Sequence, residues 1–166
     1  VWAPAEHAPR PSSGAGPEAA VRALRAHGVV TLAEPPLVLE CHDEPSIAAG
    51  EVPWAIGEPL TRRLPGTTVS VLTPQDADPA AALDSHPDRP VVLSVRGVRR
   101  RPWQASVIEA VRGNRPDVVV VEHDLPGDVG MLGPHHICTY SGSAVSAQAA
   151  ADVLTGRAAY PCAPCA

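Results

Sequence analysis

The 166-residue sequence contains no phenylalanine and no lysine, and aromatic residues make up only 3% of it, although 45% of its residues are hydrophobic. Its core must therefore be built from Val, Leu, Ile and Ala, which suits strands packed against helices better than an aromatic-rich recognition module. All 13 basic residues are arginines, and they face 18 acidic residues, so the formal net charge is −5. This negative balance argues against general binding to nucleic acid or to an anionic membrane.

Long apolar runs are absent as well. No stretch approaches the roughly 20 residues that a membrane-spanning helix needs, and none combines the charged start and apolar centre of a secretory signal. We therefore expect no membrane span, and the sequence favours a cytoplasmic location while leaving the compartment open.

The chain begins with Val1, and its one methionine is Met131. Because translation starts with methionine, we expect the chain to be a cut, processed or separately expressed piece of a longer polypeptide. A small free-standing protein with a processed N-terminus is the alternative. Residues 1–16 are rich in proline, serine and glycine and read as a linker. Residues 17–158 have the length of one α/β domain, and residues 159–166 form a cysteine-containing tail.

Strand patterns and helix patterns alternate along the domain. The run Val118 to Val121 has no polar alternation, which indicates a strand buried on both faces of a parallel sheet. Strands are predicted at 37–41, 67–72, 90–95, 118–121 and 137–140, and helices at 17–26, 79–83, 103–111 and 144–155. The connection 42–60 is expected to be irregular, with a short helix near its end. This order predicts a three-layer α/β/α sandwich around a mainly parallel, doubly wound, flavodoxin-like sheet.

The order of four segments resembles a known enzyme family. The segments are Gly50-Glu51-Val52-Pro53-Trp54 leading to Gly57 and Leu60; Val91 to Arg96 leading to Arg100-Arg101-Pro102-Trp103-Gln104; Pro116 to Pro126; and Thr139-Tyr140 through Ala149 to Gly156. In this order they resemble the C-terminal α/β domain of glycoside hydrolase family 3, in particular its bacterial β-N-acetylhexosaminidase branch. None of the segments is a catalytic signature.

The resemblance implies a division of labour within a longer parent chain. Family members hydrolyse a β-glycosidic bond with retention, through a covalent intermediate on an aspartate. That aspartate, and the His-Asp acid/base of the hexosaminidase branch, belong to an N-terminal (β/α)8 barrel for which this chain is too short. The implied partner is the barrel of the same parent, with an N-acetylglucosamine-containing substrate bound through the parent.

The resemblance gives this chain a structural role and no catalytic one. In other branches the second domain supplies an acid/base glutamate, but Glu122 matches that residue only by position. Where relatives tend to carry an acid after the strand arginine, this chain has Gly97. We therefore assign no catalytic, cofactor-binding or metal-binding residue and expect no cofactor.

Two loops at predicted strand ends carry the chemically conspicuous side chains. After the strand ending at Val95 and the strand ending at Val121, the candidate interdomain or ligand-facing residues are Arg96, Arg99, Arg100, His123, Asp124 and Asp128. The carboxyl ends of parallel strands meet at one edge of a sheet, so these cations and carboxylates should lie together. They could ion-pair internally as a solvated rim, dock a neighbouring domain or hold an anionic sugar.

The remaining polar motifs point less clearly to chemistry. His135 and His136 precede or open a strand, where neighbouring side chains point to opposite faces and cannot easily share one metal. The run His42-Asp43-Glu44 reads as loop polarity, and Ser141-Gly142-Ser143 as a helix cap.

Two alternatives to the glycosidase-domain interpretation stay open. One is a free-standing flavodoxin-like module that binds a small sugar or anionic ligand at the same strand ends. The other is a thiol redox protein using Cys162 and Cys165, although this pair has no helix after it to lower a thiol pKa. A frayed tail with ordinary thiols is the simpler interpretation of the pair, because Cys41 and Cys138 are isolated in predicted strands and supply no second ligand pair for zinc.

Overall fold

The computed structural model describes residues 15–43 and 54–160. Most of the linker-like segment, part of the 42–60 connection and the tail with Cys162 and Cys165 lie outside the described residues. No helix in the described part is long and apolar enough to cross a membrane.

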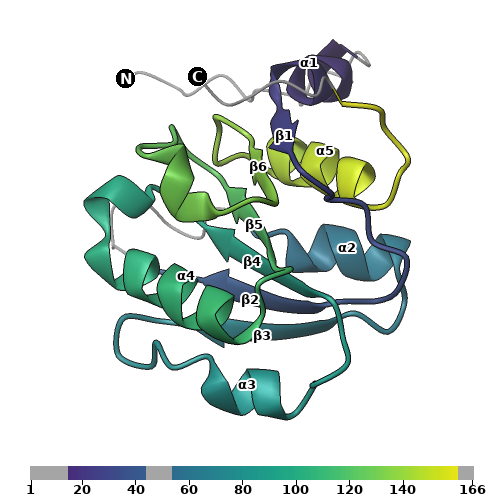
Figure 1. The fold of residues 1–166 in the computed structure, drawn as a ribbon. Helices are drawn as coiled ribbons and strands as arrows, with labels where there is room; N and C mark the ends of the chain where they lie inside the picture. Colours follow the sequence, from purple (N-terminus) through teal and green to yellow (C-terminus); the bar gives the residue numbers. More distant parts are fainter. Residues whose placement is uncertain (1–14, 44–53, 161–166) are drawn as a thin grey trace, which may run out of the picture.

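The centre of the molecule is one six-stranded sheet in the order β1-β6-β5-β4-β2-β3 (Figure 1). The strands are β1 (Arg25–His27), β2 (Leu37–Cys41), β3 (Thr68–Leu72), β4 (Val91–Val95), β5 (Val119–Glu122) and β6 (His136–Cys138). Strands β2 to β6 pair in parallel, and β1 pairs antiparallel with β6. The five parallel strands have the flavodoxin-like order, which confirms the predicted fold class.

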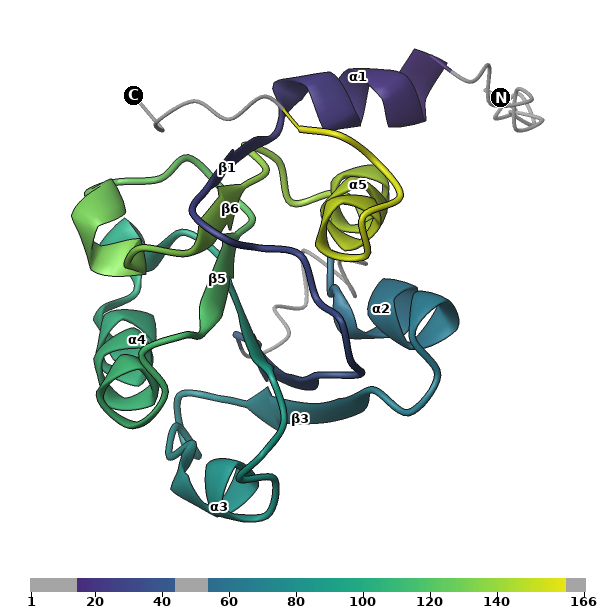
Figure 2. The same ribbon diagram turned by 45° about the vertical axis from the view of Figure 1, so that its right-hand side comes forward.

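Helices cover both faces of this sheet (Figure 2). One face carries α1 (Ala15–Ala23), α2 (Gly57–Arg63) and α5 (Ala144–Leu154), and the other carries α3 (Ala80–Asp84), α4 (Pro102–Asn114) and the two 3₁₀ turns η1 (Val98–Arg100) and η2 (Val129–Leu132). The result is the expected three-layer sandwich.

The apolar core follows from strands that are hydrophobic on both faces. In β2, Leu37 and Leu39 pack in the layer of α3 and α4, whereas Val38 packs in the layer of α2 and α5. Every residue of β2, β4 and β5 is buried. The glutamates at the ends of β2 and β5 are therefore buried too, a consequence that bears on the candidate site.

The largest difference from the predicted elements lies near the N-terminus. The sequence predicts a helix over 17–26 stopped by Gly28, but α1 ends at Ala23 and Arg25–His27 form the edge strand β1. As a strand, Arg25–His27 pair with the backbone of β6, and these pairings would be absent if α1 continued for another turn. Gly28, with φ +72°, then turns the chain away, and its backbone lies against the carbonyl of Pro134, where a Cβ would be only 2.1 Å away.

Candidate functional site at the strand carboxyl ends

The candidate residues lie at the carboxyl edge of the sheet, around the point where the strand order reverses. Strand β2 precedes His42 and Asp43, β4 precedes the arginine-rich turn, and β5 runs into His123 and Asp124. Since β2 and β4 are neighbours whose following connections lead to opposite faces, this is the position where doubly wound sheets usually bind ligands.

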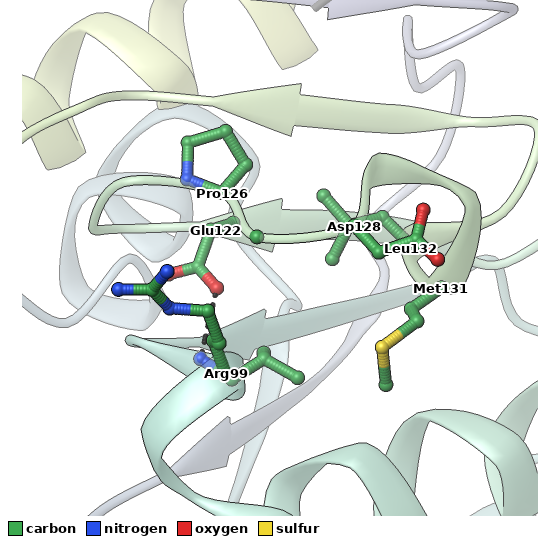
Figure 3. Close-up of a pocket in the computed structure, with 8 residues that line it drawn as sticks. Arg99, Glu122, Pro126, Asp128, Met131 and Leu132 are labelled. Carbon is green, nitrogen blue, oxygen red and sulfur yellow. Dashed lines mark hydrogen bonds between the residues drawn. The ribbon is translucent and has the colours of Figure 1, made fainter.

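Glu122, the last residue of β5, holds the neighbouring loops together. Its side chain is 1% exposed, and it accepts N–H hydrogen bonds from Gly97 at 2.7 Å, Val98 at 3.2 Å and Asp124 at 2.9 Å. Burial raises the pKa of the Glu122 carboxyl, and the three N–H donors oppose that rise. Figure 3 shows this carboxylate directed at the turn that carries Arg99. The residue is thus a structural acceptor, with both carboxylate oxygens bonded to backbone donors.

The arginine turn is tied to the acidic loops by ion pairs. Arg100 pairs with Asp124, and Arg101 pairs with Asp43 while also donating to the Arg96 carbonyl at 2.9 Å. The expected meeting of cations and carboxylates from two strand ends is therefore present for Arg100 and Asp124. Arg100 is largely exposed, so its pair contributes little to stability.

Gly97 is required by the geometry of this turn. It adopts a left-handed conformation with φ +66°, and a Cβ there would lie 2.6 Å from the Arg101 guanidinium. Any side chain at this position would be strained by the left-handed backbone, and the Arg101 guanidinium would have to move to make room for it.

An aromatic and cationic cluster centred on Trp54 lies beside these loops. Trp54 is 7% exposed. The centroid of its ring lies 5.4 Å from that of His42 and 5.5 Å from that of His123. The Arg96 guanidinium carbon lies 5.7 Å from the Trp54 ring centroid. Arg96 also lies against Gly142, where a Cβ would be 2.7 Å from Nε. Arg96, directly after β4, thereby contacts Trp54 in the connection after β2 and Gly142 in the loop after β6.

His123 is completely buried in this cluster. Its Nε2 forms a hydrogen bond with the Ser94 hydroxyl at 3.0 Å, and its Nδ1 has no hydrogen-bond partner within the described residues. Burial, and then the positive charge of Arg96, lower the pKa of His123 to about 3. His123, a candidate interdomain or ligand-facing residue, is therefore shielded from solvent within the described part of the chain.

Glu40 has the same role at the end of β2 that Glu122 has on β5. Its Oε1 accepts the Gly57 N–H at 2.6 Å, at the start of α2, and its Oε2 lies 3.0 Å from His42 Nε2. The sequence did not indicate that Glu40 and Trp54 belong to this site, although Trp54 ends the first family-like segment. A glutamate inside an otherwise apolar strand was the available signal for Glu40.

A hollow of about 360 Å³ opens next to the Glu122 loops (Figure 3). Its lining is Val98, Arg99, Glu122, Pro126, Gly127, Asp128, Met131 and Leu132. The aliphatic part of Arg99 packs against Gly127, and Asp128 caps η2 by accepting the Gly130 N–H at 2.9 Å. Of the six candidate residues, Arg99 and Asp128 therefore line this hollow, Arg100 and Asp124 form the ion pair beside it, and Arg96 and His123 lie in the Trp54 cluster.

The other sequence motifs have structural partners. Ser143 caps α5 by accepting the Ser146 N–H at 3.2 Å, as predicted. Burial, with Asp43 and Glu40 nearby, raises the pKa of the Cys41 thiol to about 12, so this thiol is unreactive. Within residues 15–43 and 54–160, no group of three or more His, Cys, Asp and Glu side chains is arranged to hold a metal ion.

No family model and no curated protein matches the sequence, but solved structures share its fold. A family 3 β-N-acetylglucosaminidase from Paenibacillus sp. str. FPU-7 matches 96% of this chain and 34% of its own, with a TM-score of 0.71 and 19% identity. A fungal multi-domain family 3 β-N-acetylglucosaminidase matches 87% of this chain and 18% of its own, with a TM-score of 0.70 and 14% identity. A β-glucosidase from Listeria innocua matches 87% of this chain and 25% of its own, with a TM-score of 0.64 and 14% identity.

These likenesses establish the fold. The chain spans about a third or less of the length of each of these enzymes. The predicted resemblance to a domain of family 3 glycoside hydrolases is therefore confirmed at the level of the fold, in chains much longer than this one.

Proposed function

We propose that this chain is the non-catalytic second domain of a family 3 glycoside hydrolase, packing against the catalytic barrel of its parent and supporting the substrate site. The observation that carries the proposal is the match over 96% of this chain to one third of a family 3 enzyme. The four sequence segments that resemble the same family also support it.

The chemistry of the strand-end residues supports a structural role. A retaining glycosidase needs one carboxylate as nucleophile and another as acid/base. In the described part of the chain, the strand-end acids are committed to other partners: Glu122 to three backbone donors, Asp124 to Arg100, and Asp43 to Arg101. These hydrogen bonds and ion pairs hold the loops after β2, β4 and β5 in place at the carboxyl edge of the sheet.

The loops after β4 and β5 are the proposed docking surface. Leu125 is 69% exposed in the loop after β5. Its neighbours in this loop contact the arginine turn: Asp124 pairs with Arg100, and Gly127 lies against Arg99. An exposed leucine bordered by arginines fits a partner surface that combines apolar and acidic groups. We define the docking surface as Arg99, Arg100, Leu125 and Asp128.

The parent is proposed to act on β-N-acetylglucosaminides. Two of the matching structures are described as β-N-acetylglucosaminidases, and the sequence segments resemble the same branch. A β-glucosidase shares the fold as well, so the substrate assignment rests on the branch resemblance and on the first two matches.

The first experiment is to sequence the coding DNA upstream of Val1. An in-frame (β/α)8 barrel with an aspartate nucleophile supports the proposal, whereas a start codon or signal peptide directly before Val1 contradicts it. The second experiment incubates the purified chain with an aryl N-acetylglucosaminide. We expect no hydrolysis, and robust turnover that Asp124→Asn abolishes would overturn the proposal.

The hollow next to Glu122 favours one alternative, a free-standing module that binds a small ligand. Saturable binding of N-acetylglucosamine by the isolated chain, lost in Arg99→Ala, would support that alternative. The thiol redox alternative rests on Cys162 and Cys165 outside the described residues, and it requires rapid disulfide exchange that Cys162→Ser abolishes.

A further inference from the structure

Three histidines gather where the edge strand β1 meets β6, at the end of the sheet opposite to the docking surface. His27 and His136 are direct partners in the antiparallel register. Their rings stack with 5.3 Å between centroids and 24° between planes. His135, the residue before β6, accepts the Val29 backbone N–H on Nδ1 at 3.0 Å. The three imidazoles thus contact β1 and the turn that follows it.

The hydrogen bond to Val29 requires a neutral His135. An imidazole nitrogen that accepts an N–H carries no proton, and a protonated imidazole donates from both nitrogens. Protonation of His135 would therefore set a donor against the Val29 N–H. Gly28 lies close to the same ring, since a Cβ there would be 2.6 Å from His135 Nδ1.

His136 also requires its neutral form. Its side chain is buried, and its Nδ1 donates to the Gly133 carbonyl at 2.7 Å. Its Nε2 is buried without a hydrogen-bond partner in the described part of the chain. A second proton on this ring would create a buried N–H without an acceptor, stacked on His27. Burial is the main cause of the lowered pKa of His136; the hydrogen bond to the Gly133 carbonyl opposes this shift, and His27 and His135 lower the pKa further.

Within residues 15–43 and 54–160, none of the three histidines forms an ion pair with an acid. Arg25 on β1 donates to the carbonyls of Arg22, Ala23 and Leu24, and Arg112 on α4 lies against Gly133. The acids of the neighbouring elements are engaged elsewhere: Asp152 on α5 with Arg63, Glu122 on β5 with loop amides, and Asp128 with η2. Glu109 of α4 is exposed. Added positive charge is therefore left uncompensated.

We propose that His27, His135 and His136 form an acid-sensitive latch that holds β1 and Val29 on the edge of β6, and that protonation releases this segment. The flanking attachments limit the release. Helix α1 stays packed against α5, and the Leu32 N–H donates to the Leu154 carbonyl at 2.7 Å. Opening the latch uncovers the outer backbone groups of β6, which can then pair with another strand.

Hydrogen–deuterium exchange of the full 166-residue chain at pH 7.5 and 5.5 tests the latch. After correction for the intrinsic pH dependence of exchange, the segment from Arg25 to Val29 is expected to lose protection by about tenfold or more, since one proton per pH unit changes a population about tenfold. The segment Val91–Val95 in β4 is the internal reference and should keep its protection. Unchanged protection of Arg25 to Val29, or equal loss in β4, would overturn the proposal.

Matched variants separate the latch from general acid sensitivity. His135→Asn keeps an acceptor near Nδ1, and His27→Phe keeps a stacked ring. The double variant retains only His136 of the latch, so the loss of β1 protection between pH 7.5 and 5.5 should be clearly smaller than in the unsubstituted chain. His86→Asn, a histidine near α3, should behave like the unsubstituted chain. Full pH dependence in the double variant contradicts the proposal. If that variant does not fold, NMR titration of the unsubstituted chain decides: the Val29 amide must shift with the same midpoint as the His135 ring, and different midpoints overturn the latch.

Discussion

The Glu122 carboxylate at the end of β5 accepts the backbone N–H of Gly97, in the turn after β4, at 2.7 Å. This contact ties two neighbouring strand ends together without a surface ion pair. The Val98 and Asp124 N–H groups donate to the same carboxylate. One buried side chain thus fixes the shape of the surface that we propose to dock the catalytic barrel.

Replacing Glu122 should therefore cost more stability than replacing an exposed glutamate. Glu122→Ala leaves three backbone donors without their acceptor, and we expect the free energy of unfolding in urea to fall by about 3 kcal/mol. Glu122→Gln keeps an acceptor for Gly97 but sets an amide donor towards Val98, so an intermediate loss is expected. Glu58→Ala, in an exposed pair with Arg62, is the control and should change stability by about 0.5 kcal/mol or less. Equal losses for Glu122→Ala and Glu58→Ala would show that Glu122 does not hold the loops.

The turn itself should be sensitive to a single methyl group. Gly97→Ala places a Cβ at φ +66° and against the Arg101 guanidinium, so the free energy of unfolding should fall by about 1 kcal/mol or more. Gly113→Ala in α4 is the matched control, because a Cβ there meets no atom within 4 Å. Its helical position predicts a gain of up to about 1 kcal/mol. Thermal or urea unfolding compares the two variants, and a neutral Gly97→Ala would mean that the turn adapts.

Periodicity and apolar runs predicted the fold because they report directly on burial. The run Val118 to Val121 is continuously apolar, the segment Leu37 to Cys41 is apolar except for Glu40, and both lead to strands buried on the two faces of the sheet. Strand β1 could not be predicted in this way. Three residues carry no usable period, and Arg25–His27 become a strand only because β6 offers a partner.

The site was predictable in its loops but not in its contacts. Topology alone places the segments after β4 and β5 at one edge, which brought Arg100 and Asp124 together as expected. The burial of His123 depends on Trp54, which is distant in the sequence and follows residues outside the described part. Long-range packing of this kind leaves no local pattern in a single sequence.

Burial of His123 makes stability depend on pH in a defined direction. Its pKa is about 3 in the folded chain and near 6.5 for an unfolded histidine, so the unfolded state binds the extra proton first. Stability should therefore be complete above about pH 6.5 and should fall as the pH drops towards 3, by up to about 1.4 kcal/mol per pH unit. Urea unfolding at pH 7.5, 6 and 5 measures this slope.

Two substitutions assign the slope to His123. His123→Gln keeps a donor for the Ser94 hydroxyl and cannot be protonated, so its stability should fall less steeply between pH 7.5 and 5 than that of the unsubstituted chain. His86→Gln should leave the slope unchanged. If both variants lose stability with pH as the unsubstituted chain does, His123 is not the group responsible.

The docking surface can be tested with two exposed apolar side chains at opposite edges of the sheet. Leu125 is 69% exposed at the carboxyl edge, and Val29 is 73% exposed where β1 meets the beginning of β6. With a barrel encoded upstream of Val1, expressed separately, Leu125→Ser should weaken binding of this chain by about tenfold or more, because full burial of a leucine side chain is worth about 1.5–3 kcal/mol. Val29→Ser should leave the affinity within about twofold. Calorimetric titration of the barrel with this chain measures both affinities.

Arg99→Glu should also weaken binding, because the proposed partner surface is acidic where it faces Arg99. A larger loss of affinity for Val29→Ser than for Leu125→Ser would place the docking surface at the other edge of the sheet.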